Sequence, residues 1–158
     1  MTAEIILRSI VPKDYATVSE ITVTSYAPYI PGDADYFDVL ADVAGRAQCS
    51  DLVVAEVDGT VVGAIAIVDA GTKFAEVAEP GEIEFRMIAV APEARGYGVG
   101  SAMVAHGLEV ARQRGCRAVV LSTLETMVDA RRIYVRFGFV DAPHRKIYRT
   151  VDVMELAL

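Results

Sequence analysis

Apolar and polar positions along the chain follow two periodicities, one typical of short strands and one typical of amphipathic helices. Residues 5–8 are an apolar run that predicts a first strand. Asp14 stands before apolar residues at helical spacing, so it is expected to cap a first helix. A stretch rich in turn residues, 27–35, then leads to a second helix, expected over 36–43.

The middle of the chain predicts a hairpin and a further strand. Apolar runs over 52–57 and 61–68 flank Asp58 and Gly59. Glycine supplies the positive φ that a tight hairpin turn requires, so the two runs are expected to pair antiparallel. After a polar, irregular stretch, apolar and charged residues alternate over 82–90. This segment is expected to be a strand with two faces of different chemistry.

The last third of the chain predicts two more helices and three more strands. One helix is expected over 101–114, followed by Gly115, and another is expected to begin at Thr126 and end at Gly138. Strands are expected over 118–121, around 139–140 and over 146–156. The order is one strand, two helices, three strands, a helix, a strand, a helix and two strands. This order predicts a single mixed α/β domain, residues 1–158, around one sheet.

Length, charge and composition restrict the class of function. A chain of 158 residues fits one domain. Its 15 basic and 22 acidic residues give a formal net charge of −7, so nucleic acid is not an expected partner. No apolar run approaches the roughly 20 residues of a membrane helix, and the N-terminus does not resemble a secretory signal. The two cysteines are too few and too far apart for a disulfide framework or a zinc site, so we expect reduced thiols in a cytoplasmic protein. The two histidines lie outside the motifs, so no metal is expected. A membrane partner is not expected either.

A glycine-rich turn stands between the strand 82–90 and the helix 101–114. Its sequence is Arg95-Gly96-Tyr97-Gly98-Val99-Gly100. Glycines at alternate positions let backbone N–H groups approach an anion at the positive end of the helix dipole, so a pyrophosphate would fit. A tight strand-to-helix connection is the alternative. The turn lacks the Lys-Ser/Thr ending of a P-loop, and it lacks the G-x-G-x-x-G spacing, with an acidic residue about 20 positions on, of a dinucleotide-binding fold.

Two further segments extend the pattern around this turn. Residues 86–100 form a strand that runs into an R-x-x-G-x-G loop, and residues 130–139 follow the pattern A-x-x-x-Y-x-x-x-G-F. Together with the hairpin 55–63, these blocks resemble the GNAT superfamily of acyl-CoA-dependent N-acyltransferases. The resemblance covers nearly the whole chain and implies a central, mostly antiparallel, twisted sheet of about seven strands flanked by about four helices. Met127 departs from the family pattern, in which many members carry an asparagine that touches the cofactor.

The resemblance also implies roles for named residues, with acetyl-CoA as the co-substrate. Tyr134 would protonate the leaving thiolate, and the alternative is an aromatic side chain of the core. Glu84 would act as the general base, and the alternative is an ion pair with Arg86. A backbone N–H near Ile88 or Val90 would stabilise the oxyanion. The residues expected to bind the donor are Ile88, Ala89, Val90, Arg95, Gly96, Tyr97, Gly98, Val99, Gly100 and Ser101.

Acceptor selection is expected from the segment between the first two helices and from residues 72–82. Tyr26, Tyr29 and Tyr36 alternate there with acidic residues, which suits a cationic amine with an apolar body. A solvated acidic loop with tyrosines packed on the core is equally consistent. We therefore expect an N-acetyltransferase that moves an acetyl group to a primary amine of a small molecule or peptide by direct attack in a ternary complex. The alternative is an inactive acyl-CoA-binding sensor or interaction module, and a homodimer is left open.

Overall fold

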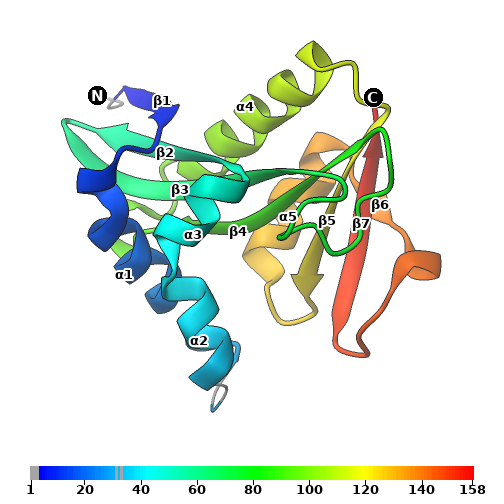
Figure 1. The fold of residues 1–158 in the computed structure, drawn as a ribbon, viewed down its shortest axis with the longest axis horizontal. Coiled ribbons are helices and arrows are strands. Elements are labelled where there is room, and N and C mark those ends of the chain that lie inside the picture. Colours follow the sequence, from blue (N-terminus) through cyan, green and yellow to red (C-terminus); the bar gives the residue numbers. More distant parts are fainter. Residues whose placement is uncertain (1–3, 31, 33) are drawn as a thin grey trace.

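The computed structural model describes residues 4–30, 32 and 34–158 and shows a seven-stranded sheet with helices on both faces (Figure 1). The strands lie in the order β1-β2-β3-β4-β5-β7-β6, and every neighbouring pair is antiparallel except β4 and β5. Their bounds are β1 Ile5–Ser9, β2 Asp51–Val57, β3 Thr60–Asp69, β4 Glu82–Val90, β5 Ala118–Leu124, β6 Val140–Asp141 and β7 Val151–Ala157. The expected mixed α/β class and strand count are confirmed.

The described residues form five α-helices, one more than expected. The helix expected over 36–43 is divided, because Asp42 interrupts it and accepts a hydrogen bond from the amide of Gly45 at the start of the next helix. The helices are α1 Tyr15–Tyr26, α2 Ala34–Ala41, α3 Val43–Cys49, α4 Val99–Gln113 and α5 Val128–Phe137. The first three lie on one side of the sheet and the last two on the other (Figure 1). None of the helices in the described part of the chain has the length and apolar character to cross a membrane.

Two expected boundaries were wrong, and one expected cap has a different role. Asp14 stands at the N-cap position of α1 as expected, but its side chain makes no bond to the helix; its carboxylate accepts the Val11 amide and pairs with Arg8 (2.8 Å). Thr126 does not cap α5, since Met127 is the capping residue and makes no side-chain bond. The strand expected from residue 146 begins only at Val151, after a 3₁₀ turn and a loop.

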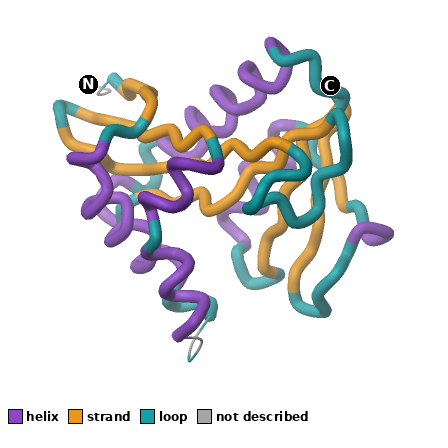
Figure 2. The backbone as a smooth tube through the Cα atoms, viewed as in Figure 1, coloured by secondary structure: helices purple, strands orange, loops and turns teal. Residues whose placement is uncertain are grey.

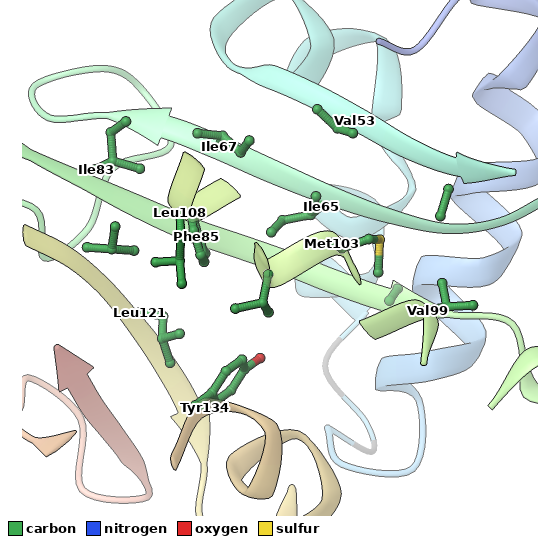
Figure 3. Packing of buried hydrophobic residues seen from close by; sticks show 14 of the residues in the cluster. Val53, Ile65, Ile67, Ile83, Phe85, Val99, Met103, Leu108, Leu121 and Tyr134 are labelled. Carbon is green, nitrogen blue, oxygen red and sulfur yellow. The ribbon is translucent and has the colours of Figure 1, made fainter. Parts of the chain in front are cut away.

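Apolar side chains pack on both faces of the sheet. One cluster lies under α4 and α5 and includes Ile65, Phe85 and Leu121 (Figure 3). A smaller cluster on the opposite face contains Val18 and Val43 from α1 and α3. These two layers hold α1 and α4 against opposite sides of β3 and β4, so the N-terminus of α4 is fixed beside the end of β4.

Glycine permits the close contact between α4 and β4. A Cβ atom at Gly107 would lie 2.5 Å from the Phe85 ring, which is closer than real Cβ contacts allow. The absence of a side chain at this point lets the helix lie directly over the buried ring. Gly107 therefore sets the height of α4 above the strand.

The strand β4 is divided by a bulge. Ala64 of β3 pairs with Ala89 but Ala66 pairs with Arg86, so β4 carries one extra residue between them. Met87, within this interval, has a φ of +51°, which is rare for a residue with a side chain. The parallel pairing of β4 with β5 runs from Glu82 only as far as Phe85. Beyond the bulge, the second half of β4 therefore has no partner on the β5 side.

Candidate active site

A cavity of about 520 Å³ lies where β4 and β5 separate. Its walls come from the end of α1, the second half of β4, the glycine turn with the first turn of α4, the end of β5, and α5. Because α1 lies on one face of the sheet and α5 on the other, the cavity is bordered from both faces. Nine of the ten residues expected to bind the donor line it, and the tenth, Tyr97, is 78% exposed and does not.

The glycine turn presents backbone at one end of this cavity. Gly96 and Gly98 have φ of +84° and +85°, and Gly98 is the residue that precedes the first turn of α4. A Cβ atom at either glycine would meet no other atom within 4 Å, so the space beside the turn is open. The amides of the first turn of α4 have no partner within the helix, which makes this end a favourable place for an anion.

The second half of β4 turns its backbone groups toward the cavity. The amide of Ala91 bonds the Val62 carbonyl and Ala89 pairs with Ala64, so the backbone groups of these two residues face β3. Backbone groups alternate between the two edges of a strand, so those of Ile88 and Val90 face the other edge. Both residues line the cavity. Their N–H groups therefore point to the side where β5 has diverged.

Two side chains of α1 reach the same segment. The Ser25 hydroxyl donates to the Val90 carbonyl (3.3 Å), and the Tyr26 hydroxyl donates to the Ile88 carbonyl (3.4 Å). These bonds tie the end of α1 to the unpaired edge of β4. The spacing of α1 identified Tyr26 but gave no reason to single out Ser25.

Tyr134 projects from α5 toward the sheet and lines the cavity (Figure 3). Its ring lies edge-on to Phe139, with centroids 5.9 Å apart, and the side chain is 6% exposed. Burial raises the pKa of its hydroxyl above the usual value for tyrosine, so the group keeps its proton. Among the described residues, none makes a hydrogen bond to this hydroxyl. A protonated phenol is thus held at the cavity wall with its donor unused.

The structure places only two of the three tyrosines expected at the acceptor side in the cavity. Tyr26 and Tyr29 line the cavity, whereas Tyr36 does not. Burial raises the pKa of Tyr26, and the nearby Tyr134 and Tyr36 raise it further. Burial also raises the pKa of Tyr36, while the Arg86 guanidinium opposes that shift. The acidic residues expected beside these tyrosines are Asp33, Asp35 and Asp38. Asp33 lies outside the described residues, and the exposed Asp35 and Asp38 do not line the cavity.

Glu84 is bonded elsewhere and does not line the cavity. Its side chain is 1% exposed, and Oε1 accepts hydrogen bonds from three consecutive amides, those of Glu76, Val77 and Ala78, at 2.8–3.0 Å. The Arg86 Nε lies 3.9 Å from the other carboxylate oxygen. This arrangement favours the structural alternative over the general-base role, because the lone pairs of Oε1 are already occupied by the β3–β4 loop (residues 70–81).

The β3–β4 loop is a long segment without helix or strand (Figure 2). Besides Glu84, it is held by Arg86, which donates to the Phe74 carbonyl (3.0 Å) and pairs with Glu76 (2.8 Å). None of the loop residues lines the cavity, so the expected acceptor contacts from 72–82 are not brought to it. The loop instead packs beside the C-terminal segment, where Arg145 contacts Val77.

Several cavity residues were missed by reading the sequence. They are Ser25, Val104, Ser122, Thr123, and the α5 residues Arg132 and Arg136. A signal existed for Thr123, because Val119, Leu121 and Thr123 share one face of β5 and the third breaks an apolar alternation. A signal also existed for the arginines, which stand on α5 in an otherwise acidic chain.

A model of the acetyltransferase (GNAT) family matches residues 16–139, and the chain belongs to this family. Over 88 residues it is 33% identical to an uncharacterized N-acetyltransferase of Schizosaccharomyces pombe, with 56% of this chain and 50% of that protein covered. The chain thus spans about half the length of the curated relative it matches.

Solved structures share the whole fold. One is the PaiA N-acetyltransferase from Thermoplasma acidophilum in complex with coenzyme A, with a TM-score of 0.78, 14% identity, and 98% of this chain and 99% of that chain covered. Another is a GNAT family acetyltransferase from Brucella melitensis in complex with acetyl-CoA, with a TM-score of 0.68, 25% identity, and 98% and 88% covered. The likeness extends over all the elements that border the cavity.

Proposed function

We propose that this protein is an N-acetyltransferase that moves an acetyl group from acetyl-CoA to a primary amine of an acceptor by direct attack in a ternary complex. The observation that carries the proposal is one cavity that joins three features: the glycine turn, the open edge of β4 and the buried hydroxyl of Tyr134. A binding site alone would need the first two. The protonated phenol adds a group that can take part in chemistry.

The residues at the cavity suit a phosphorylated acyl donor. The turn at Gly96 and Gly98 leaves open space where side chains would stand, and it ends at the N-terminus of α4. Arg95, Arg132 and Arg136 also line the cavity, together with one acidic residue, Asp129, which pairs with Arg132 (3.3 Å), in a chain whose net charge is −7. The remaining local excess of positive charge favours a ligand with several phosphates. When bound, acetyl-CoA would supply the activated acetyl thioester.

The chain's own groups divide the remaining work. Ile88 and Val90 present N–H groups along the open edge of β4, where they can stabilise negative charge on a carbonyl oxygen. Ser25 and Tyr26 hold the carbonyls of the same two residues and so orient that edge. The Tyr134 Oη holds a proton that it can give to a departing thiolate.

The acceptor amine would approach from the α1 side. Tyr26 and Tyr29 line the cavity there and offer aromatic faces and hydroxyls. We assign Glu84 to holding the β3–β4 loop, so the amine proton leaves through water in the cavity. This assignment differs from the role that the family resemblance implies for Glu84.

Release of free thiol tests the proposal. The protein is incubated with acetyl-CoA and a panel of primary amines, and thiol appearance is followed with a chromogenic disulfide while the product is identified by mass spectrometry. The expected result is thiol release that depends on one class of amine and yields the N-acetyl product. Saturable binding of acetyl-CoA without turnover on any amine would instead indicate a sensor, and failure to bind acetyl-CoA would remove the donor site.

A further inference from the structure

Thr123 carries a buried hydroxyl without a partner. The residue lies on β5 and is 3% exposed, and its Oγ1 has no hydrogen-bond partner among the described residues. A buried hydroxyl normally finds a partner, because leaving one unbonded costs about 1–3 kcal/mol. Thr22 on α1 shows the usual case, since its Oγ1 donates to the Val18 carbonyl at 2.7 Å. Thr123 is therefore an exception at a place where a ligand is expected.

The position of Thr123 connects it to the donor side of the cavity. It follows Val119 and Leu121 on the face of β5 that packs in the cluster with Tyr134. It also lies beyond Phe85 and Leu121, the last pair between β4 and β5, so β4 is not paired with β5 at Thr123. Thr123 itself lines the cavity.

The surroundings restrict the kind of partner that could satisfy this hydroxyl. Of the residues 127–136 that line the cavity, those that are buried or half-buried are neutral: Met127, Ala130, Ile133 and Tyr134. The charged ones, Asp129, Arg132 and Arg136, are exposed, whereas Thr123 is buried. A charged group placed here would lose its hydration with little compensation, so the partner is expected to be neutral. Threonine can donate or accept one bond after rotation about its Cα–Cβ bond, which would move Oγ1 along the wall.

We propose that the Thr123 hydroxyl is a donor-binding group that hydrogen bonds a neutral amide of the pantetheine arm of the acyl donor. The inference rests on the proposed function, because it takes acyl-CoA as the ligand of this cavity. In the free protein the hydroxyl remains unbonded, so the protein gives up some stability to keep a polar group ready for the ligand. Binding and stability should then respond to its removal in opposite directions.

Thr123→Val tests this, because valine keeps the shape and removes the hydroxyl. Titration calorimetry with CoA, which needs no acceptor and no turnover, should show a Kd about three- to tenfold higher than for the wild type. The melting temperature without ligand should be unchanged or higher. Thr123→Ser should restore most of the affinity. A wild-type Kd in the valine variant would overturn the inference, as would a clear fall in its ligand-free melting temperature, since that would indicate a structural partner.

Two controls separate this inference from the proposed function. Adenosine 3′,5′-bisphosphate, a fragment of CoA that lacks the pantetheine arm and one phosphate of the pyrophosphate, should bind the wild type and Thr123→Val equally. An equal loss with both ligands would show that Thr123 acts through the fold. Thr22→Val removes a buried hydroxyl that already has a partner and should leave the Kd for CoA unchanged. If the wild type itself does not bind CoA, the proposed function fails. If it binds CoA and the valine variant binds equally well, only the role of Thr123 fails.

Discussion

The two halves of β4 differ in sequence and in the state of their polar groups: acidic and apolar residues alternate over 82–85, whereas residues 87–90 are all apolar. In the first half, Glu82 pairs with Arg145 (2.7 Å) and accepts the Glu79 amide, and Glu84 accepts three amides of the β3–β4 loop. In the second half, after the bulge at Met87, the backbone of the strand faces a cavity. One half is paired on both sides and the other on one side only.

This difference shows that availability, and not residue type alone, decides which groups can do chemistry. Glu84 in the first half is the predicted base, but its carboxylate holds the loop, and the neighbouring Glu82 holds the C-terminal segment through Arg145. The second half contains no acidic side chain and offers N–H groups at an open edge. The bulge lies at the boundary between the two roles, because the pairing with β5 ends at Phe85, just before the extra residue.

The largest effect is expected from Tyr134→Phe, which removes the hydroxyl at the open half and keeps the ring against Phe139. If Tyr134 protonates the leaving thiolate, kcat should fall about 10²–10⁴-fold while the KM for acetyl-CoA changes little. Steady-state kinetics measure both. An acyl donor whose thiol has a low pKa should recover part of the rate. A wild-type kcat in the variant would mean that another group protonates the leaving thiolate.

The next effect concerns the paired half. Glu84→Ala leaves three loop amides and Arg86 without their carboxylate, so the free energy of unfolding should fall by about 3 kcal/mol in urea denaturation. The matched control is Glu76→Gln, which removes a more exposed partner of the same Arg86 and should cost less than about 1 kcal/mol. If Glu84→Ala had normal stability and no turnover, the Glu84 carboxylate would have a catalytic role and not a structural one.

Local signals in the sequence predicted much of the fold and the donor end of the site. The hairpin turn at Asp58, the glycine turn and the apolar periodicity of α4 each depend on a few neighbouring residues, and all were placed correctly within a few positions. Nine of the ten residues expected at the donor site line the cavity for the same reason, since a strand followed by a glycine turn carries them together.

Long-range contacts could not be predicted in this way. Glu84 finds its partners in a loop that folds back over it, and Tyr36 lies beside Arg86 and away from the cavity. The bulge at Met87 has no local signature, because methionine does not favour a positive φ and only the register with β3 reveals the extra residue. The division of the second helix at Asp42 was also missed, although aspartate is a common cap.

A smaller effect is expected from Gly98→Val at the glycine turn. Gly98 has a φ of +85°, so valine strains the turn and places methyl groups where a pyrophosphate would approach. The Kd for CoA should rise about tenfold or more, and the rise in melting temperature with acetyl-CoA should largely disappear. Gly71→Val is the matched control, because Gly71 has a φ of +80°, has open space around it and lies away from the cavity. It should lose stability with no change in Kd, and an equal loss of affinity in both variants would show that strain alone is responsible.

The smallest effect is a pH dependence that belongs to the paired half. The hydrogen bonds from Arg145 lower the pKa of Glu82 below its usual value, and those from Arg8 lower the pKa of Asp14 in the same way. A carboxyl group whose pKa is lower in the folded protein stabilises it fully above the unfolded pKa of about 4, and this contribution is lost as the pH falls through the folded pKa. The free energy of unfolding should therefore decline below about pH 4.

Glu82→Gln should be less stable than the wild type at neutral pH and show a shallower decline, because the carboxyl group of residue 82 no longer takes up a proton as the protein unfolds. Urea denaturation at a series of pH values measures both slopes. An unchanged slope in Glu82→Gln would mean that the ion pair with Arg145 contributes nothing to stability.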